Sequence, residues 1–221
     1  MDIHRPKALH NWREFLKEIG TIIVGILLAL AFEAVVGWAR TGRDLREARE
    51  ALRAELGQDA ANLKAMAAEA RCADARLKLL EDWGAGKVKI DSANLASMEN
   101  RPLFYNLRAS AWDVTKSGAV AARMPVRERL AYASVYDSIS NQMVHIIDER
   151  HAWDLLARYA GKTSLDAAEA KALTADIASV RIQDAGLRFN TPDLLDEIAK
   201  LGVKPAAAPP RDPTLLCRPP R

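Results

Sequence analysis

An apolar run near the amino terminus constrains this chain more than any other feature. Residues 19–39 form a stretch of 21 residues with one charged side chain, Glu33. Since an α-helix rises about 1.5 Å per residue, such a helix reaches about 30 Å, the hydrocarbon thickness of a bilayer. Trp12 and Trp38 lie near its ends, where indole rings favour the headgroup region. The run predicts a transmembrane helix over residues 18–40, embedded in a membrane lipid bilayer.

Two other interpretations of the run stay open. A buried core helix is disfavoured, because residues 19–32 contain no charge and no polar face beyond Thr21. A cleaved signal peptide is suggested by the small residues "ALA" at 29–31. Against it, the charged region before the run is long and the apolar sequence continues past this site.

Small and polar side chains share one face of the predicted span. They follow at four-residue spacing and are Thr21, Gly25, Ala29, Glu33 and Gly37. Small residues at this spacing let two helix backbones approach closely in lipid, and a carboxyl group among them would face a protein neighbour. We expect a membrane helix interface, with a second copy in a homo-oligomer or with another membrane protein subunit. The alternative is that Glu33 snorkels to the membrane surface or is protonated.

The orientation of the span follows from its flanks. Basic residues occur on both sides, so the count of Lys and Arg leaves the positive-inside rule undecided. The basic leader of residues 1–17 is short and easily kept in the cytoplasm, whereas long domains translocate largely regardless of charge. We therefore expect a single-pass protein of the bacterial inner membrane, with a cytoplasmic amino terminus and a periplasmic carboxy-terminal domain.

The two cysteines are Cys72, in a helical run, and Cys217, near the carboxy terminus. In an oxidising compartment an even count fits a single disulfide that pins the tail to the first helix of the domain. Two cysteines are also what a cytosolic chain of this length carries by chance, so both interpretations stay open.

Helical periodicity dominates the remainder of the chain. Leucine and other apolar residues recur every three or four positions from Leu45 to Leu80, with Asp59 interrupting one core position. A short helix is expected near residues 91–100 and another beginning close to Pro102. Further helix starts are indicated at Pro125, at Ser164, and at Thr191 with Pro192. Gly202 indicates the end of the last of these helices.

These patterns predict an all-α protein. One transmembrane helix continues into a long amphipathic helix with coiled-coil spacing and then into an antiparallel helical bundle over residues 41–202. Six of the ten prolines lie between Lys204 and Arg221. Residues 203–221 are therefore predicted to form an extended tail.

Composition and motifs argue against several functions. The net charge of +3 is a small difference between 32 basic and 29 acidic residues spread along the chain, so no nucleic-acid footprint is expected. Neither a nucleophile elbow nor a glycine-rich phosphate loop occurs, and no cofactor is implied. In "HIIDERH", His145 and Glu149 share a helical face, as do Asp148 and His151, but ordinary salt bridges explain them better than a metal site. We expect no catalytic, cofactor-binding or metal-binding residues.

One polar cluster could line a pocket. The stretch "SAWDVTKSG" contains Trp112 and Asp113, and His145 lies on a later helix. These three residues are a candidate ligand pocket within the bundle. In the alternative interpretation, Trp112 anchors the core while Asp113 pairs with Lys116 at the surface.

A resemblance adds to this picture. The segment "HRPKALHNWREFLKEIGTIIVGILLALAFE", the heptad helix after it, Cys72 and "LRASAWDVT" resemble a group of uncharacterised single-span proteins of alphaproteobacterial type. The resemblance implies a bacterial, membrane-anchored helical domain. It supplies no functional residue to carry over.

Two functions follow as expectations. The first is a membrane-anchored interaction or scaffold protein that self-associates or serves as an accessory subunit of a larger inner-membrane complex. The alternative is a membrane-anchored enzyme or small-ligand sensor with a pocket near Trp112, Asp113 and His145. A concave site that gathers polar groups would favour the alternative, and a solid bundle core would favour the first.

Overall fold

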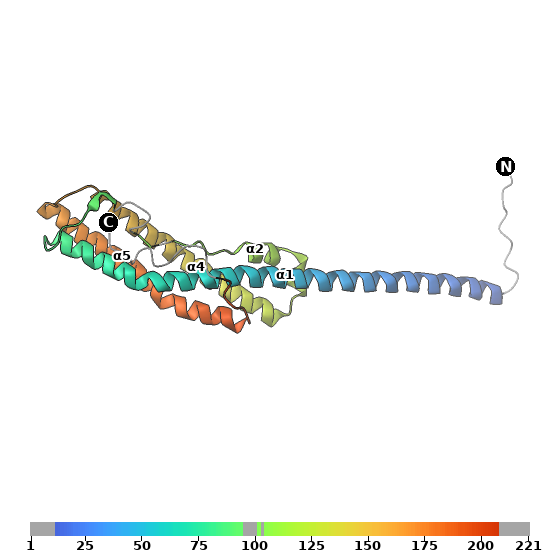
Figure 1. The fold of residues 1–221 in the computed structure, drawn as a ribbon. Coiled ribbons are helices and arrows are strands. Elements are labelled where there is room, and N and C mark those ends of the chain that lie inside the picture. Colours follow the sequence, from blue (N-terminus) through green and yellow to red (C-terminus); the bar gives the residue numbers. More distant parts are fainter. Residues whose placement is uncertain (1–11, 95–100, 103, 208–221) are drawn as a thin grey trace, which may run out of the picture. The chain divides into compact units, whose positions relative to one another are not determined.

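The computed structural model describes residues 12–94, 101–102 and 104–207 (Figure 1). Every regular element in these residues is a helix, which confirms the all-α prediction. The elements are α1 (Trp12–Gly84), the 3₁₀ helix η1 (Ser92–Asn94), α2 (Ser110–Ser117), α3 (Ala119–Arg123), α4 (Val126–Leu156), the 3₁₀ helix η2 (Ala157–Tyr159) and α5 (Ala167–Lys200).

The chain divides into two compact units, residues 1–47 and residues 48–221. The described part of the first unit is the beginning of α1, whose large apolar side chains from Ile19 to Trp38 are exposed. Among the described residues, α1 is the one helix long and apolar enough to cross a membrane. Its most apolar 18-residue window has no residue buried against the protein. The apolar run is thus a helix without a protein core of its own, as expected of a segment whose solvent is lipid.

The second unit is a bundle of three long helices, formed by residues 48–84 of α1 with α4 and α5 (Figure 1). α4 runs parallel to α1: Arg49 forms a two-pronged ion pair with Glu128, both N–O distances being 2.7 Å, near the start of α4. α5 runs antiparallel, since Arg188 pairs with Asp74 at 2.8 Å while Leu173, near the start of α5, packs on the end of α1.

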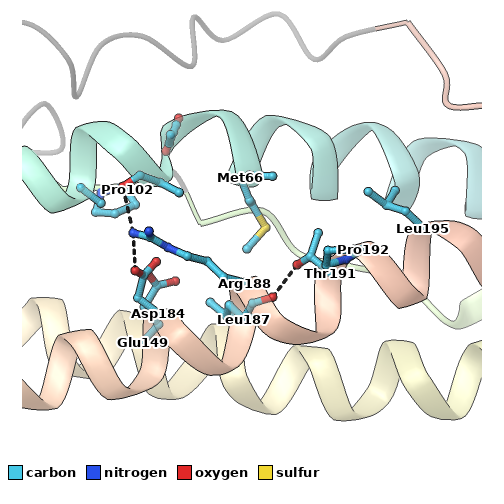
Figure 2. A pocket seen from close by; sticks show the side chains of 13 residues that line it. Met66, Pro102, Glu149, Asp184, Leu187, Arg188, Thr191, Pro192 and Leu195 are labelled. Carbon is cyan, nitrogen blue, oxygen red and sulfur yellow. Dashed lines mark hydrogen bonds and ion pairs between the residues drawn. The ribbon is translucent and has the colours of Figure 1, made fainter.

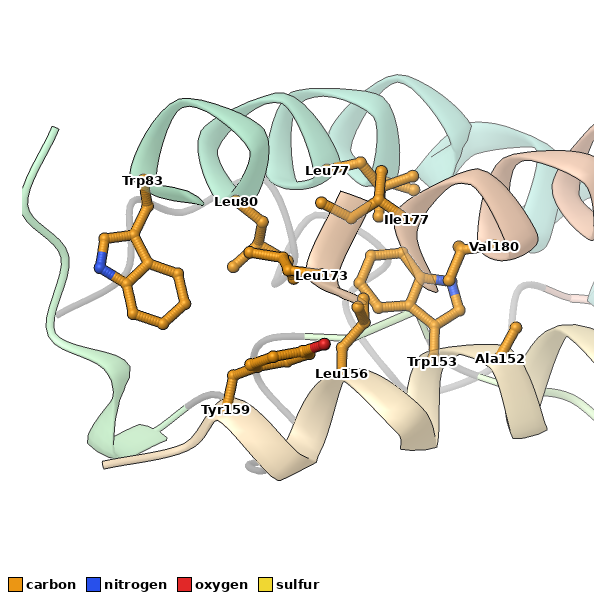
Figure 3. Close-up of a cluster of buried hydrophobic side chains, with 11 residues drawn as sticks. Leu77, Leu80, Trp83, Ala152, Trp153, Leu156, Tyr159, Leu173, Ile177 and Val180 are labelled. Carbon is orange, nitrogen blue, oxygen red and sulfur yellow. The ribbon is translucent and has the colours of Figure 1, made fainter. Parts of the chain in front are cut away.

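A cluster of apolar side chains fills the end of this bundle at which α1 terminates (Figure 3). All three long helices and η2 contribute to it. Its members are Ala73, Leu77, Leu80, Trp83, Ala152, Trp153, Leu156, Tyr159, Leu173, Ile177 and Val180. The heptad positions of α1 therefore supply one wall of a folded core, because burying apolar surface is the main favourable term in folding.

The described residues between η1 and α2, 101–102 and 104–109, are non-helical and form a return segment beside α1. The Asp59 carboxylate accepts the backbone N–H of Arg108 at 3.1 and 3.2 Å, and the Glu55 carboxylate accepts that of Ala111 at 3.0 Å. The prediction of a helix from Pro102 is wrong, since α2 begins only at Ser110. Asp59 therefore binds a backbone donor of the segment, whereas Glu55 binds a donor in the first turn of α2, where N–H groups have no acceptor within the helix.

α5 corrects two expected helix boundaries. Its N-cap is Asp166, which forms a capping box with Glu169, rather than Ser164. No new helix begins at Thr191 and Pro192, because α5 continues through both residues. The Thr191 hydroxyl donates to the Leu187 carbonyl at 2.7 Å inside the helix, instead of capping a helix that follows.

Other predicted boundaries are confirmed. α1 ends at Gly84, α4 follows Pro125, and Gly202, with a φ of 72°, lies just after α5. Residues 203–207 then pass α1 in non-helical conformation, where the Ala206 N–H donates to the Gly57 carbonyl at 2.8 Å. A Cβ at Gly57 would lie 3.0 Å from the Lys204 carbonyl oxygen, so glycine permits this close approach. Residues 208–221 of the predicted tail lie outside the described residues.

Candidate functional site

The predicted membrane interface lies on the exposed part of α1. Thr21, Gly25, Ala29, Glu33 and Gly37 are all exposed, and the Thr21 hydroxyl donates to the Lys17 carbonyl at 2.9 Å. A Cβ at either glycine of the face would meet nothing of the described chain within 4 Å. The face is open along its length, and its role as an interface stays a prediction.

The structure places Trp112, Asp113 and His145 in separate surroundings. Trp112 is buried and stacks on Tyr136, with ring centroids 5.7 Å apart and an interplanar angle of 7°. Asp113 is exposed and pairs with Lys116 at 2.7 Å. His145 lies nine residues beyond Tyr136 on α4, about 13 Å along the helix axis.

These positions agree with the alternative that makes Trp112 a core anchor and Asp113 a partner of Lys116. His145 packs against α5 instead, since a Cβ at Gly186 would lie 3.6 Å from its Nδ1. None of the three residues lines the cavity described next.

A different cavity lies between α1, α4, α5 and the return segment (Figure 2). Its volume is about 300 Å³. The walls are mostly apolar and come from α1, α5 and the segment before α2; they include Met66, Ala67, Ala70, Ala73, Pro102, Leu187, Pro192 and Leu195. The polar lining consists of Glu69, Glu149, Asp184, Arg188 and Thr191. Apolar walls with a few converging polar groups are the usual composition of a small-molecule site.

Buried carboxyls gather at one side of this cavity. Glu69 on α1 and Glu149 on α4 are only 2% and 4% exposed. Burial raises the pKa of Glu149 to about 8, and the charge of Asp184 acts in the same direction; the Trp153 indole and Arg188 oppose it. Burial also raises the pKa of Asp184, against the opposing effect of Arg188. Carboxyls with raised pKa values in a cavity mark a candidate functional site.

Arg188 joins α5 to α1 beside these carboxyls (Figure 2). One terminal nitrogen pairs with Asp74 at 2.8 Å. The other pairs with Asp184 at 2.5 Å and donates to the Ala70 carbonyl at 2.9 Å. These partners, Asp74 first, raise the pKa of Arg188, so its charge is permanent and its position is restrained.

The sequence alone did not indicate this site, because the histidine- and acid-rich stretch of α4 is also typical of a surface helix with ordinary salt bridges. A signal was present. The buried positions of α4 include Ile139, Gln142, Ile146, Glu149, Trp153 and Leu156, which follow the three-and-four spacing of a core face. Polar residues at such positions, here Gln142 and Glu149, indicate buried polar contacts in the bundle.

One cysteine of the predicted disulfide lies within the described residues and the other lies outside them. Cys72 lies on α1 and packs against the apolar cluster of Figure 3. Cys217 lies outside the described residues, so the bridge stays a prediction.

Two further observations bear on function. Among the described residues, no group of three or more His, Cys, Asp or Glu side chains is arranged to hold a metal ion. In comparisons with known proteins, the chain matches no family model, no curated protein and no solved structure.

Proposed function

We propose that this protein is a membrane-anchored helical interaction protein, with α1 as its single membrane span. The observation that carries the proposal is the exposure of the apolar side chains from Ile19 to Trp38, beside a second unit that has its own apolar core. Apolar patches this large are rare on soluble monomers and mark contact with lipid or protein. Function then lies in holding the bundle at a membrane and bringing it to a partner.

The proposed partner is a second copy of this chain or another membrane protein subunit. Gly25 and Gly37 leave the backbone of α1 accessible, which allows a second helix to approach closely in lipid. Glu33 lies on the same face, where an ionisable group in the membrane needs a hydrogen-bonding neighbour. The proposed location is the bacterial inner membrane, with the bundle in the periplasm.

Association in membranes tests this proposal. In the variant Gly25→Ile with Ala29→Ile, added side chains hold a second helix away from the backbone, so crosslinking or energy transfer between labelled copies should fall several-fold. Co-purification with a native membrane protein, identified by mass spectrometry, is the readout if the partner is a different subunit. Glu33→Leu should weaken association more than Glu33→Gln, because glutamine retains a hydrogen-bonding group.

A matched control is available on the opposite face of the same helix. Gly20→Ile with Ala31→Ile changes the same two residue types, and at 100° per residue both positions point away from the Gly25 face. This control should associate like the wild type. Unchanged association in both the Gly25/Ala29 variant and Glu33→Leu would contradict the proposed interface and leave α1 as an anchor alone.

Less supports the alternative function, a membrane-anchored enzyme or small-ligand sensor with a pocket near Trp112, Asp113 and His145. Tyr136 stacks on the Trp112 ring, and Asp113 pairs with Lys116 at the surface.

A further inference from the structure

The cavity between α1, α4 and α5 combines apolar walls with buried carboxyls that outnumber the basic groups beside them. We propose that it binds a small organic cation with an apolar body, an amine whose charged nitrogen lies beside the carboxyl of Glu149. The inference goes beyond membrane association and does not depend on it.

Glu149 is a buried carboxyl in the wall of the cavity. Its side chain lines the cavity and is 4% exposed. Among the described residues no ion pair reaches it: both terminal nitrogens of Arg188 are engaged by Asp74, Asp184 and the Ala70 carbonyl. A buried carboxylate requires a counter-charge or a proton, because burial of an isolated charge is costly. Glu149 therefore offers a negative group to a ligand.

The surrounding charges have the same sign. Glu69 on α1 and Asp184 on α5 line the same cavity, and their charges raise the pKa of Glu149, whereas the charge of Arg188 on α5 lowers it. Arg76 is a buried cation of α1, two turns beyond Glu69, and burial lowers its pKa. The four carboxyls named in this region, Glu69, Asp74, Glu149 and Asp184, outnumber the two guanidinium groups of Arg76 and Arg188, so a positive charge in the cavity would be stabilised.

The walls decide between a metal ion and an organic cation. The described carboxyls are not arranged as a metal-binding group. Met66, Leu187 and Leu195 add apolar surface that a hydrated metal ion would not use. A volume of about 300 Å³ lies at the lower end of ligand pockets and accommodates a ring or short chain beside the nitrogen.

The raised pKa of Glu149 adds a linked property. With a pKa of about 8, Glu149 is mostly protonated at pH 6 and must release that proton when an ammonium group binds beside it. Affinity for an amine should therefore increase roughly tenfold or more between pH 6 and pH 8. A neutral ligand of the same shape should show no such increase.

Matched probes test the proposal on the full chain, reconstituted in nanodiscs of zwitterionic lipid. The probes are benzylamine, benzyl alcohol and benzoate, which share a ring and differ in charge, with empty nanodiscs as the blank. Dissociation constants come from ligand-observed NMR titration at pH 6 and pH 8. At pH 8 we expect benzylamine to bind at least roughly tenfold more tightly than benzyl alcohol, and benzoate not at all.

Three variants locate the binding. Glu149→Gln keeps the shape of the side chain but not its charge, so it should remove the preference for benzylamine and its pH dependence while benzyl alcohol still binds. Asp148→Asn changes the exposed neighbouring residue and should retain both. Ala70→Leu fills part of the cavity and should abolish binding of both probes. Equal affinity for amine and alcohol, an unchanged preference in Glu149→Gln, or no binding of either probe to the wild type would each overturn the proposal.

Discussion

At the scale of single residues, two carboxyls of α1 accept hydrogen bonds from distant parts of the chain. Asp59 interrupts the apolar repeat, is fully buried, and binds the Arg108 N–H of the return segment. Glu55, one turn earlier, accepts from the Ser110 hydroxyl at 2.6 Å, the Ala111 N–H at 3.0 Å and the Tyr136 hydroxyl at 3.0 Å. Both carboxyls thus connect α1 to chain that is far away in sequence.

The buried carboxyl of Asp59 predicts a pH dependence of stability. Burial raises its pKa from 3.8 to about 7 in the folded protein, so the folded state binds a proton more tightly than the unfolded state. Its contribution is complete below the unfolded pKa and is lost as pH rises through about 7. We expect the apparent melting temperature, followed by circular dichroism in detergent, to be lower at pH 8 than at pH 5.

The variant Asp59→Asn should reduce this fall, because the amide oxygen still accepts the Arg108 N–H but carries no charge. Glu149, whose pKa is also raised, contributes a remaining part in the same direction. Asp113→Asn, at an exposed ion pair, serves as the control and should fall like the wild type. A fall in Asp59→Asn as large as in the wild type would show that Asp59 does not titrate as described.

At the scale of elements, α5 tolerates a proline in its interior because tertiary contacts hold it. Pro192 has no N–H to donate to the Arg188 carbonyl one turn earlier. The helix continues since Leu187, Leu194 and Ile198 are buried on either side of it. Gln142 Nε2 of α4 also donates to the Thr191 hydroxyl at 3.0 Å, which fixes α5 at this turn.

Replacing Pro192 with alanine should stabilise the bundle by roughly 1 to 3 kcal/mol, because alanine restores a donor and removes the clash of the ring. Denaturant unfolding followed by tryptophan fluorescence measures the change. Pro125→Ala, at the N-cap of α4, is the matched control and should have a much smaller effect, because no helical hydrogen bond is missing there. A destabilised Pro192→Ala variant would contradict this account of α5.

The path of the chain after α5 makes the Cys72–Cys217 bridge feasible. Ala206 lies beside Gly57, and the 15 residues of α1 from Gly57 to Cys72 rise about 22 Å. The 11 residues from Ala206 to Cys217 can extend over about 36 Å. The tail is therefore long enough to reach Cys72.

Non-reducing peptide mapping of protein purified from the native membrane should find one Cys72–Cys217 peptide. Reduction, or Cys217→Ser, should lower the free energy of unfolding by about 2 to 5 kcal/mol, because the bridge closes a long loop in the unfolded chain. Two alkylatable thiols in unreduced protein would refute the bridge.

At the scale of the whole molecule, the two units differ in where their apolar side chains lie. The large apolar side chains of the first unit from Ile19 to Trp38 are exposed, whereas the second unit has a buried apolar core. This division is typical of a domain tethered by a membrane span rather than of a helix that completes a core.

Fusions at the two ends test the proposed orientation. A reporter that is active only in the periplasm should be active after Arg221 and inactive before Met1, because the short basic leader stays in the cytoplasm. A reporter that is active only in the cytoplasm, fused at the same two positions, is the control and should give the reverse pattern. Activity of the periplasmic reporter only at the amino terminus would place the bundle in the cytoplasm and remove the basis for the disulfide.

Local patterns were sufficient for much of the fold. The length and polarity of residues 19–39 determine the exposed apolar helix, because a stretch without a polar face cannot lie at the surface of a soluble core. The three-and-four spacing of leucine determines the buried face of α1. The ends of α1 and α5 follow from glycines in left-handed conformation two residues beyond them, Gly86 with a φ of 70° and Gly202 with a φ of 72°, and this conformation depends only on local sequence.

Only the tertiary structure decided the rest, because it depends on contacts between residues distant in sequence. The start of α2 at Ser110 depends on carboxylates of α1, and the continuation of α5 through Pro192 depends on its burial against α4. The candidate cavity needs Glu69, Glu149 and Asp184 from three helices. The pattern of one helix can indicate that one of these residues is buried, but their convergence on one cavity arises from the register of the bundle.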